Sequence, residues 1–205
     1  LAARPAVLIV DEPLAAVDVK SAERWRHFLH AARADRTTLL VTHDALDIAH
    51  LAQDMLVMES GQVRAHGATA RLLEAPPTGF VAALAGLNRL EGTVTEIGAS
   101  AVEVACGDIT VLATTNHASL ALGQEVAVTF APHAATIGAA PETCNQWSVR
   151  VLVVEATSLA AMQLRVDLGG QEATVPGDRE FALGVAVGNI VSLTVSKANV
   201  FVHPN

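Results

Sequence analysis

Two adjacent carboxylates, Asp11 and Glu12, directly follow the apolar run of residues 6–10. Pro5 and Pro13 bound this run, and a short apolar run of this kind is typical of a strand buried on both faces of a parallel sheet. Ligands bind at the carboxyl ends of strands in such sheets. Two acids at that point are costly without positive charge, and the usual source is a metal ion carried by a phosphate. We therefore expect the pair to face a metal–phosphate ligand.

A second apolar stretch, residues 37–42, ends at His43 about thirty residues later, and the segment 14–18 closes with Asp18. In this order, the three stretches resemble the Walker B strand, the D-loop and the switch-histidine loop of the ABC-transporter ATPases. Had His43 stood alone, it would be interpreted as a capping or core histidine. The shared order and spacing favour the family resemblance.

The resemblance implies a role for each polar residue, with ATP and Mg²⁺ as cofactors. Asp11 would hold Mg²⁺ through water, because this hard cation prefers oxygen ligands and keeps several waters. Glu12 would polarise the attacking water at the γ-phosphate, where positioning and charge stabilisation supply most of the catalysis. His43 would contact the γ-phosphate. Asp18 would act across the interface with a second ATPase subunit, in a homodimer.

Two motifs of this family are missing from the 205 residues: the phosphate loop G-x-x-x-x-G-K-[ST] and the Leu-Ser-Gly-Gly-Gln signature. Residues 1–5 resemble the end of the helix that follows the signature. We therefore interpret residues 1–85 as the C-terminal part of an ATPase domain, and expect the chain alone to be inactive on ATP. In the family, the phosphate-loop strand lies between the strand ending at Thr42 and the strand 55–59. Residues 1–85 should therefore be marginal or prone to aggregation in isolation.

Hydrophobic periodicity and turn signals predict the remaining elements of this first part. We expect a helix over residues 19–33 and another over 44–52 with Asp44 as its N-cap. The other expected elements are a hairpin of strands 55–59 and 62–66, a short helix 69–74, a break at 76–79 and a final helical turn within 80–85.

From residue 88 onward, short alternating Val-rich segments separated by Gly, Asn, Asp and Pro are typical of a small β-barrel or sandwich. Residues 122–129 align without gaps on residues 187–194, which indicates an internal repeat. The copies cover about 88–140 and 146–203, and each is too small to bury much alone. The expected fold class is thus an α/β part with an incomplete P-loop NTPase sheet, followed at 86–205 by an all-β OB-like barrel of two tandem repeats.

This β part resembles the TOBE barrels appended to ABC import ATPases and, more narrowly, the paired Mop-type oxyanion-binding repeats of molybdate systems. Residues 88–92 match the N-x-L-x-G opening, and residues 183–188 match L-G-L-x-x-G. The opening Ser-Ala-Arg is replaced by residues 85–87, Ala-Gly-Leu. Ser196 stands where a lysine is expected, and Lys197, shifted by one, would point to the other face of a strand.

Molybdate as a regulatory ligand would need hydroxyls, amides and positive charge, because an oxyanion must be both hydrogen-bonded and neutralised. A purely structural or dimerising barrel is the alternative. The candidate oxyanion residues are Asn88, Thr114, Thr115, Ser119, Ser196 and Lys197.

The composition narrows the class of protein. The formal charge of −8 argues against nucleic acid as a partner, and no apolar run is long enough to span a membrane. Cys106 and Cys144 have no metal-ligand spacing and are expected to be free thiols. With no signal segment at its start, the chain is expected to be cytoplasmic and, once assembled, peripheral on the inner face of the membrane.

These features favour the ATP-binding, energy-coupling subunit of an ABC importer, with molybdate as the first choice of cargo. Its expected partners are a second ATPase subunit, a membrane permease subunit and, indirectly, an extracellular or periplasmic substrate-binding protein. Two alternatives stay open. One is a stand-alone oxyanion-binding or sensing module with an inert ATPase remnant, and the other is an importer ATPase for sulfate, iron or polyamine.

Overall fold

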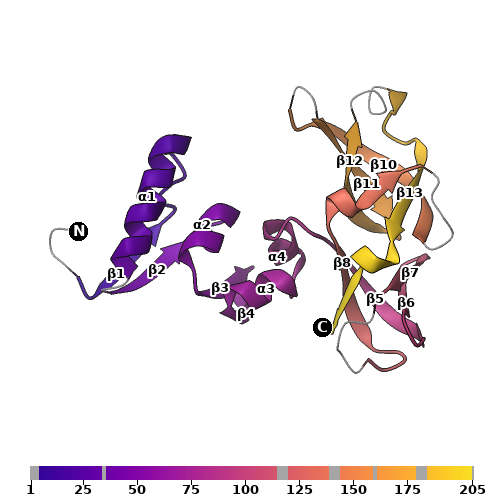
Figure 1. Cartoon of the computed structure of the whole chain (residues 1–205), viewed down its shortest axis with the longest axis horizontal. Coiled ribbons are helices and arrows are strands. Elements are labelled where there is room, and N and C mark those ends of the chain that lie inside the picture. The colour runs from indigo at the N-terminus through magenta and orange to yellow at the C-terminus, as the bar shows by residue number, and fades with distance from the viewer. Residues whose placement is uncertain are drawn as a thin grey trace. The chain divides into compact units, whose positions relative to one another are not determined.

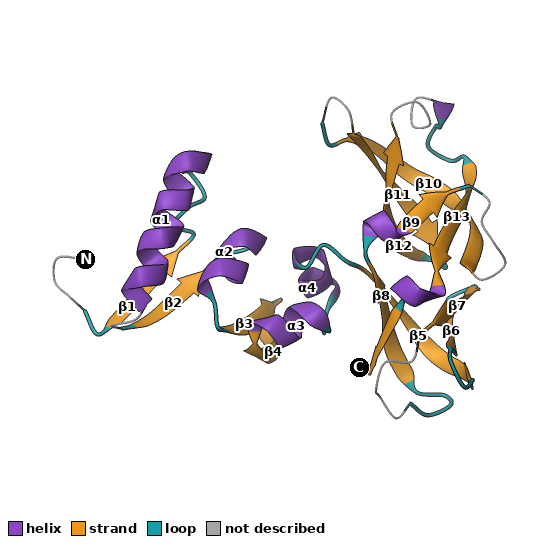
Figure 2. Cartoon of the chain, in the orientation of Figure 1, coloured by secondary structure: helices purple, strands orange, loops and turns teal. Residues whose placement is uncertain are grey.

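The computed structural model describes residues 5–33, 36–114, 120–138, 144–158, 161–178 and 184–204. The chain separates into two compact units, residues 1–85 and residues 86–205 (Figure 1). Strands dominate, and the helices are few and belong mostly to the first unit (Figure 2).

The first unit alternates strands and helices, close to the expected pattern. Its strands pair as β1 with β2 in parallel and β3 with β4 in an antiparallel hairpin. Side chains of Asp18, Asp44 and Thr78 accept backbone N–H bonds at the starts of α1, α2 and α4, as N-caps do. The elements are β1 (Val7–Asp11), α1 (Val19–Ala32), β2 (Thr37–Val41), α2 (Ala45–Leu51), β3 (Asp54–Glu59), β4 (Gln62–Ala68), α3 (Thr69–Glu74) and α4 (Gly79–Leu84).

The expectation that the strand before Asp11 is buried on both faces is wrong for this structure. Val7 and Ile9 are 56% and 67% exposed, and on β2 Leu39 and Val41 are also exposed. The β1–β2 sheet has only two strands among the described residues, and these four side chains lie on one exposed face of it. The buried cluster of this unit is small and joins α2, β3 and α4 through Ile48, Met55, Val57 and Val81.

The second unit consists of two five-stranded antiparallel sheets, ordered β14-β8-β5-β6-β7 and β12-β11-β10-β13-β9. The first repeat supplies β5 (Asn88–Ile97), β6 (Val102–Cys106), β7 (Ile109–Ala113), β8 (Glu125–Phe130) and β9 (Ala135–Ile137). The second supplies β10 (Cys144–Ala156), β11 (Ala161–Leu168), β12 (Gln171–Asp178), β13 (Ile190–Ser196) and β14 (Phe201–Pro204). Short 3₁₀ turns, η2 (Pro132–Ala134) and η3 (Lys197–Asn199), precede β9 and β14.

The two repeats exchange their last strands. β9 of the first repeat pairs with β13 of the second, and β14 of the second repeat pairs with β8 of the first. Each sheet therefore contains four strands from one repeat and one from the other. Neither sheet is complete without both copies.

Two asparagines at equivalent places in the repeats join the sheets. The Asn88 amide accepts from the backbone N–H of Thr174 and donates to its carbonyl, at 2.7 and 2.8 Å. The Asn145 amide does the same with Leu112, at 2.6 and 2.8 Å. Both side chains are buried, so each pair of bonds satisfies polar groups that burial would otherwise make costly.

The hairpin turns β6–β7 and β11–β12 meet closely at Gly107 and Gly169. Both residues have positive φ, 60° and 66°. A Cβ on Gly107 would lie 1.8 Å from the Gly169 carbonyl oxygen, and one on Gly169 would lie 2.2 Å from the Cys106 carbonyl oxygen. Only glycine satisfies both the backbone conformation and the contact.

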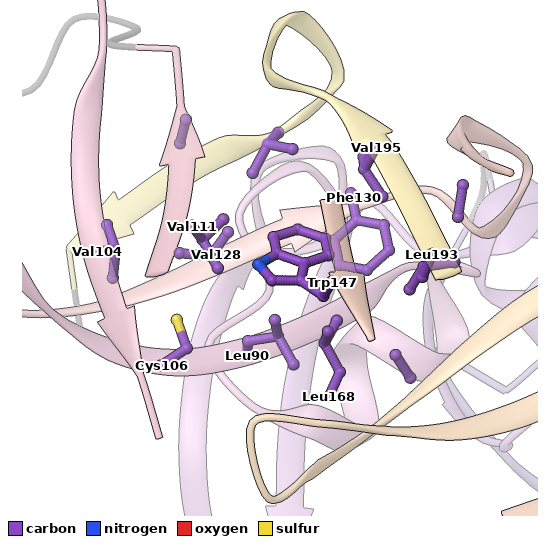
Figure 3. Packing of buried hydrophobic residues seen from close by; sticks show 14 of the residues in the cluster. Leu90, Val104, Cys106, Val111, Val128, Phe130, Trp147, Leu168, Leu193 and Val195 are labelled. Atoms are coloured by element: carbon purple, nitrogen blue, oxygen red, sulfur yellow. The ribbon is translucent and has the colours of Figure 1, made fainter. Parts of the chain in front are cut away.

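One core fills the space between the sheets. Figure 3 shows Trp147 and Phe130 among aliphatic side chains from strands of both repeats, such as Leu90 and Leu193. The Trp147 indole Nε1 donates to the Thr110 carbonyl at 2.9 Å, which satisfies its one polar atom. Cys106 is a free buried thiol, and burial raises its pKa to about 11, so it remains protonated and unreactive at neutral pH.

Candidate functional site

The first unit brings Glu12 and His43 into contact. The parallel register places Asp11, the last residue of β1, beside Val41 of β2, so the residues that follow both strands meet at one edge. The backbone N–H and Nδ1 of His43 both lie within hydrogen-bonding distance of Glu12 Oε1, at 3.1 and 2.7 Å. A carboxylate and an imidazole predicted from separate stretches of sequence therefore form one pair.

Glu12 adopts an unusual backbone conformation at this edge. Its φ of 42° lies in the left-handed region, which costs a non-glycine residue about 1–2 kcal/mol. The Glu12 N–H donates to the Val41 carbonyl at 2.9 Å, and this bond together with the two His43 contacts holds the conformation. Strain retained at a carboxylate is a feature of functional sites.

The pair is open to solvent, with side-chain exposures of 76% for His43 and 34% for Glu12. The hydrogen bond to Glu12 and the charge of its carboxylate raise the pKa of His43 above its ordinary value of 6.5, and Asp44 adds to the rise. The imidazole therefore favours its protonated form more than a free histidine does.

Asp11 lies at the end of β1 and is exposed. Among the described residues, no group of three His, Cys, Asp or Glu side chains could enclose a metal ion. The donor set at this edge, two adjacent carboxylates, fits a hard cation that keeps its waters and takes its other ligands from a phosphate. Asp11 would hold Mg²⁺ in this way.

Asp18 caps α1, where its carboxylate accepts from the Ser21 backbone N–H at 3.1 Å. Hydrogen bonds from Ser21 lower the pKa of Asp18 below its ordinary value of 3.8. The side chain is exposed, so it presents a fixed negative charge at the start of the helix.

Sequence reasoning missed the ion pair between Arg26 of α1 and Asp47 of α2, whose Nε and Oδ1 atoms are 2.5 Å apart. The available signal was the position of Arg26 on the helix stripe that also contains the buried Ala22 and Leu29. A charged residue on such a stripe requires a partner.

A hollow of about 360 Å³ on α1 is lined by Ser21, Arg24, Trp25 and Phe28, and so does not include Glu12 or His43.

The oxyanion candidates of the second unit only partly come together. Thr114 donates from Oγ1 to the Lys197 carbonyl at 2.8 Å, which places it beside the Ser196–Lys197 segment. Asn88 lies elsewhere, since its amide is bonded to Thr174. Thr115 and Ser119 lie outside the described residues.

The interpretation of Lys197 as a strand residue pointing to the opposite face from Ser196 is wrong. β13 ends at Ser196, and Lys197 begins the 3₁₀ turn η3. The alternation of side chains in a strand therefore does not apply to it. The Lys197 side chain is half-buried, and the contact of this residue with Thr114 is made by its backbone carbonyl.

No helix in the parts of the chain that the structure describes has the length and apolar character to cross a membrane.

The TOBE domain family matches residues 141–202. The molybdenum import ATP-binding protein ModC of Mycobacterium tuberculosis (strain ATCC 25618 / H37Rv) is 32% identical over 220 residues, which covers 100% of this chain and 57% of that protein.

A second relative is named for the import of a different anion. The sulfate/thiosulfate import ATP-binding protein CysA 1 of Chromobacterium violaceum is 33% identical, covering 98% of this chain and 56% of that protein. Among solved structures, the cytoplasmic molybdate-binding protein ModG with molybdate bound has a TM-score of 0.48 at 24% identity, covering 58% of this chain and 96% of that one. The chain spans a little over half the length of the curated relatives that it matches along its whole length.

Proposed function

We propose that this chain, as one of the ABC import ATP-binding proteins that carry a TOBE domain, supplies the residues that catalyse hydrolysis at an ATP site. The observation that carries the proposal is the contact of Glu12 Oε1 with the backbone N–H and Nδ1 of His43. Glu12 positions and polarises a water, and His43 holds the Glu12 carboxylate while its ring faces the terminal phosphate. Mg²⁺, held through water by Asp11, neutralises charge on the phosphates.

The phosphates are held by polypeptide outside the 205 residues, which contain no phosphate loop. The uncovered apolar residues of the first unit support this proposal. Val7, Ile9, Leu39 and Val41 expose one face of β1–β2, and Leu56, Met58 and Val63 are exposed on the β3–β4 hairpin. A further strand and its flanking elements would bury these side chains.

Reconstitution tests this proposal. The full chain is mixed with a segment that carries the phosphate loop and signature of a ModC-type relative, and Mg²⁺-dependent phosphate release is measured. Glu12→Gln is expected to lower turnover at least about 100-fold while nucleotide still binds, because it removes charge stabilisation only at the attacking water. Glu23→Gln, an exposed carboxylate of α1, is the matched control and should leave turnover unchanged. Equal turnover in both variants, or micromolar Mg²⁺-dependent ATP binding by the chain alone, would contradict the proposal.

The assembled protein is proposed to be a homodimer at the cytoplasmic face of the membrane, with Asp18 facing the second subunit and a permease subunit as its membrane partner. A substrate-binding protein outside the membrane would deliver the cargo. Molybdate is the proposed cargo because a molybdenum import protein matches the whole chain. Sulfate is the second candidate, because a sulfate/thiosulfate import protein matches at nearly the same identity and coverage.

The second unit is proposed to bind the oxyanion as a regulatory ligand near Thr114, Ser196 and Lys197. Isothermal titration with molybdate, tungstate and sulfate tests this, with Lys197→Met and, as its matched control, the exposed Lys20→Met of the first unit. Loss of the lysine charge is expected to weaken molybdate binding about tenfold, and the control should bind normally. An absence of heat for all three anions would remove the site and leave a structural barrel.

A further inference from the structure

We propose that Arg26 is a positioning residue for His43: its guanidinium, on α1, fixes the N-terminus of α2 and with it the histidine that precedes this helix. The importance of His43 rests on the proposed function. The placement of Arg26 rests on the contacts of the free chain.

The first contact is the ion pair with Asp47. Arg26 Nε lies 2.5 Å from Asp47 Oδ1, and the two side chains are 18% and 2% exposed. A carboxylate so deeply buried must keep its partner, because an unpaired buried charge is strongly destabilising. α1 and α2 pack against each other, and the pair therefore fixes where the first turn of α2 lies on α1.

The second contact reaches the residue beside His43. Arg26 Nη2 lies 3.8 Å from Asp44 Oδ1. Asp44 Oδ1 also accepts from the N–H groups of Leu46 and Asp47, at 2.8 and 3.0 Å, and so caps α2. One carboxylate oxygen thus joins the guanidinium of α1 to the start of α2.

His43 lies between two residues that this arrangement holds in place. The Asp44 N–H donates to Thr42 Oγ1 at 3.1 Å, which closes the turn around His43. Within that turn, the His43 N–H and Nδ1 both reach the same Glu12 oxygen. A shift of the α2 terminus would move the two groups together, so the Glu12 contact depends on the position of the helix.

Arg33 provides a control on the same two helices. Its Nη1 donates to the Leu51 carbonyl at 3.2 Å, at the C-terminal end of α2 and away from His43. Arg26 and Arg33 therefore hold opposite ends of one short helix. Loss of either should loosen the packing of α2, but only loss of Arg26 should release His43.

The test is an NMR measurement on the full 205-residue chain without nucleotide. The ring ¹⁵N shifts of His43 report its bond to Glu12, and the exchange rate of its amide proton reports the backbone bond. Arg26→Gln is expected to move the ring shifts toward those of a free histidine and to raise amide exchange about tenfold, the equivalent of one lost hydrogen bond. Arg33→Gln should leave both signals unchanged, because the hydrogen bond it removes lies at the other end of α2. Arg26→Lys should restore part of the signal, because it keeps the charge but not the fork that reaches both carboxylates.

If Arg26→Gln does not fold, Asp47→Asn performs the test, since it keeps the side-chain volume and a neutral acceptor for Arg26. It is expected to raise His43 amide exchange about threefold, because a charged acceptor is replaced by a neutral one. Equal His43 signals in the Arg26 and Arg33 variants, or no change in Asp47→Asn, would show that Arg26 only packs the helices and would overturn the inference. These signals do not involve ATP, so failure of reconstituted hydrolysis would refute the proposed function separately.

Discussion

The two units of this chain differ in how much of their apolar sequence they bury by themselves. Among the residues that the structure describes, 23 buried residues of the second unit form one continuous cluster between the sheets, whereas the cluster of the first unit has four. Of the seventeen large apolar side chains that are exposed in the described part of the chain, twelve lie in residues 1–85. The unit that carries the Glu12–His43 pair leaves apolar side chains exposed to solvent, whereas the unit of repeats buries its apolar side chains in a core of its own.

The difference follows from how strands find neighbours. β1 and β2 form a sheet of two strands, which rarely supports an independent core. In the second unit, each repeat donates its last strand to the other sheet, so two short copies build five-stranded sheets with a shared interior. The comparison predicts that the first unit unfolds well before the second.

The largest effect is expected at the contact of the two hairpin turns. Gly107→Ala should destabilise the second unit by at least about 3 kcal/mol, because it combines a strained positive φ with an overlap onto Gly169 that requires backbone movement. Gly123 also has positive φ, but a Cβ there meets nothing within 4 Å. Gly123→Ala should therefore cost only about 1–2 kcal/mol. Chemical denaturation followed by Trp147 fluorescence measures both, and similar losses would show that the turns can separate freely.

Two leucines, one in each unit, test directly whether the units differ in burial. Leu193 is fully buried in the second unit, whereas Leu39 on β2 is 55% exposed. Leu193→Ala should cost about 3 kcal/mol, and Leu39→Ala less than about 0.5 kcal/mol. Each unit contains one tryptophan, Trp25 or Trp147, so Trp→Phe variants assign each unfolding transition to its unit. A large loss in Leu39→Ala would mean that β2 is covered in solution.

The next prediction concerns how much the asparagine hydrogen bonds between the repeats stabilise the second unit. Asn88→Ala and Asn145→Ala should each cost about 2 kcal/mol, because each leaves a buried backbone N–H and carbonyl without their partner. Asn199→Ala, at an exposed position in η3, should be near neutral. Thermal unfolding of the three variants gives the comparison. If Asn88→Ala leaves the stability unchanged, the bonds to Thr174 contribute little, and the Asn88 side chain stays available for the ligand role predicted from its motif.

The smallest change concerns the pair in the first unit. Glu12→Gln should lower the pKa of His43 toward 6.5, because Glu12 is the main cause of its rise. Asp44→Asn should lower that pKa less, and Asn serves equally well as an N-cap. Since the pKa is raised in the folded chain, the contact stabilises below about pH 6.5 and weakens as pH rises through the folded value. NMR titration of the His43 ring measures all three proteins, and an unchanged midpoint in Glu12→Gln would place the carboxylate elsewhere.

Much of the local structure was predictable because it depends on local chemistry. The Asp44 cap, the Ser60–Gly61 turn and the strand ending at Asp11 all follow from side-chain type and period. The family resemblance implied that Glu12 and His43 both act at one γ-phosphate, but their direct hydrogen bond was not predicted. The exposure of Val7 and Ile9 did not, because an apolar run shows what a strand can bury and not whether a cover is present.

The exchange of last strands between the repeats lay beyond the sequence pattern. Alternation in residues 135–137 and 201–204 indicates which side chains face the core, but it does not say which neighbouring strand accepts the backbone bonds. Asn88 shows the same limit. Its motif suggested a ligand, whereas its amide bonds Thr174, 86 residues away, a pairing that no local spacing reveals.

The exchanged strands also set an order for synthesis. β14, Phe201–Pro204, forms the edge of the sheet that begins with β5 at Asn88. The earlier sheet therefore cannot close until β14 has been synthesised, long after β5. Contacts between such distant segments slow folding, so this sheet stays incomplete beside β8 until β14 pairs there.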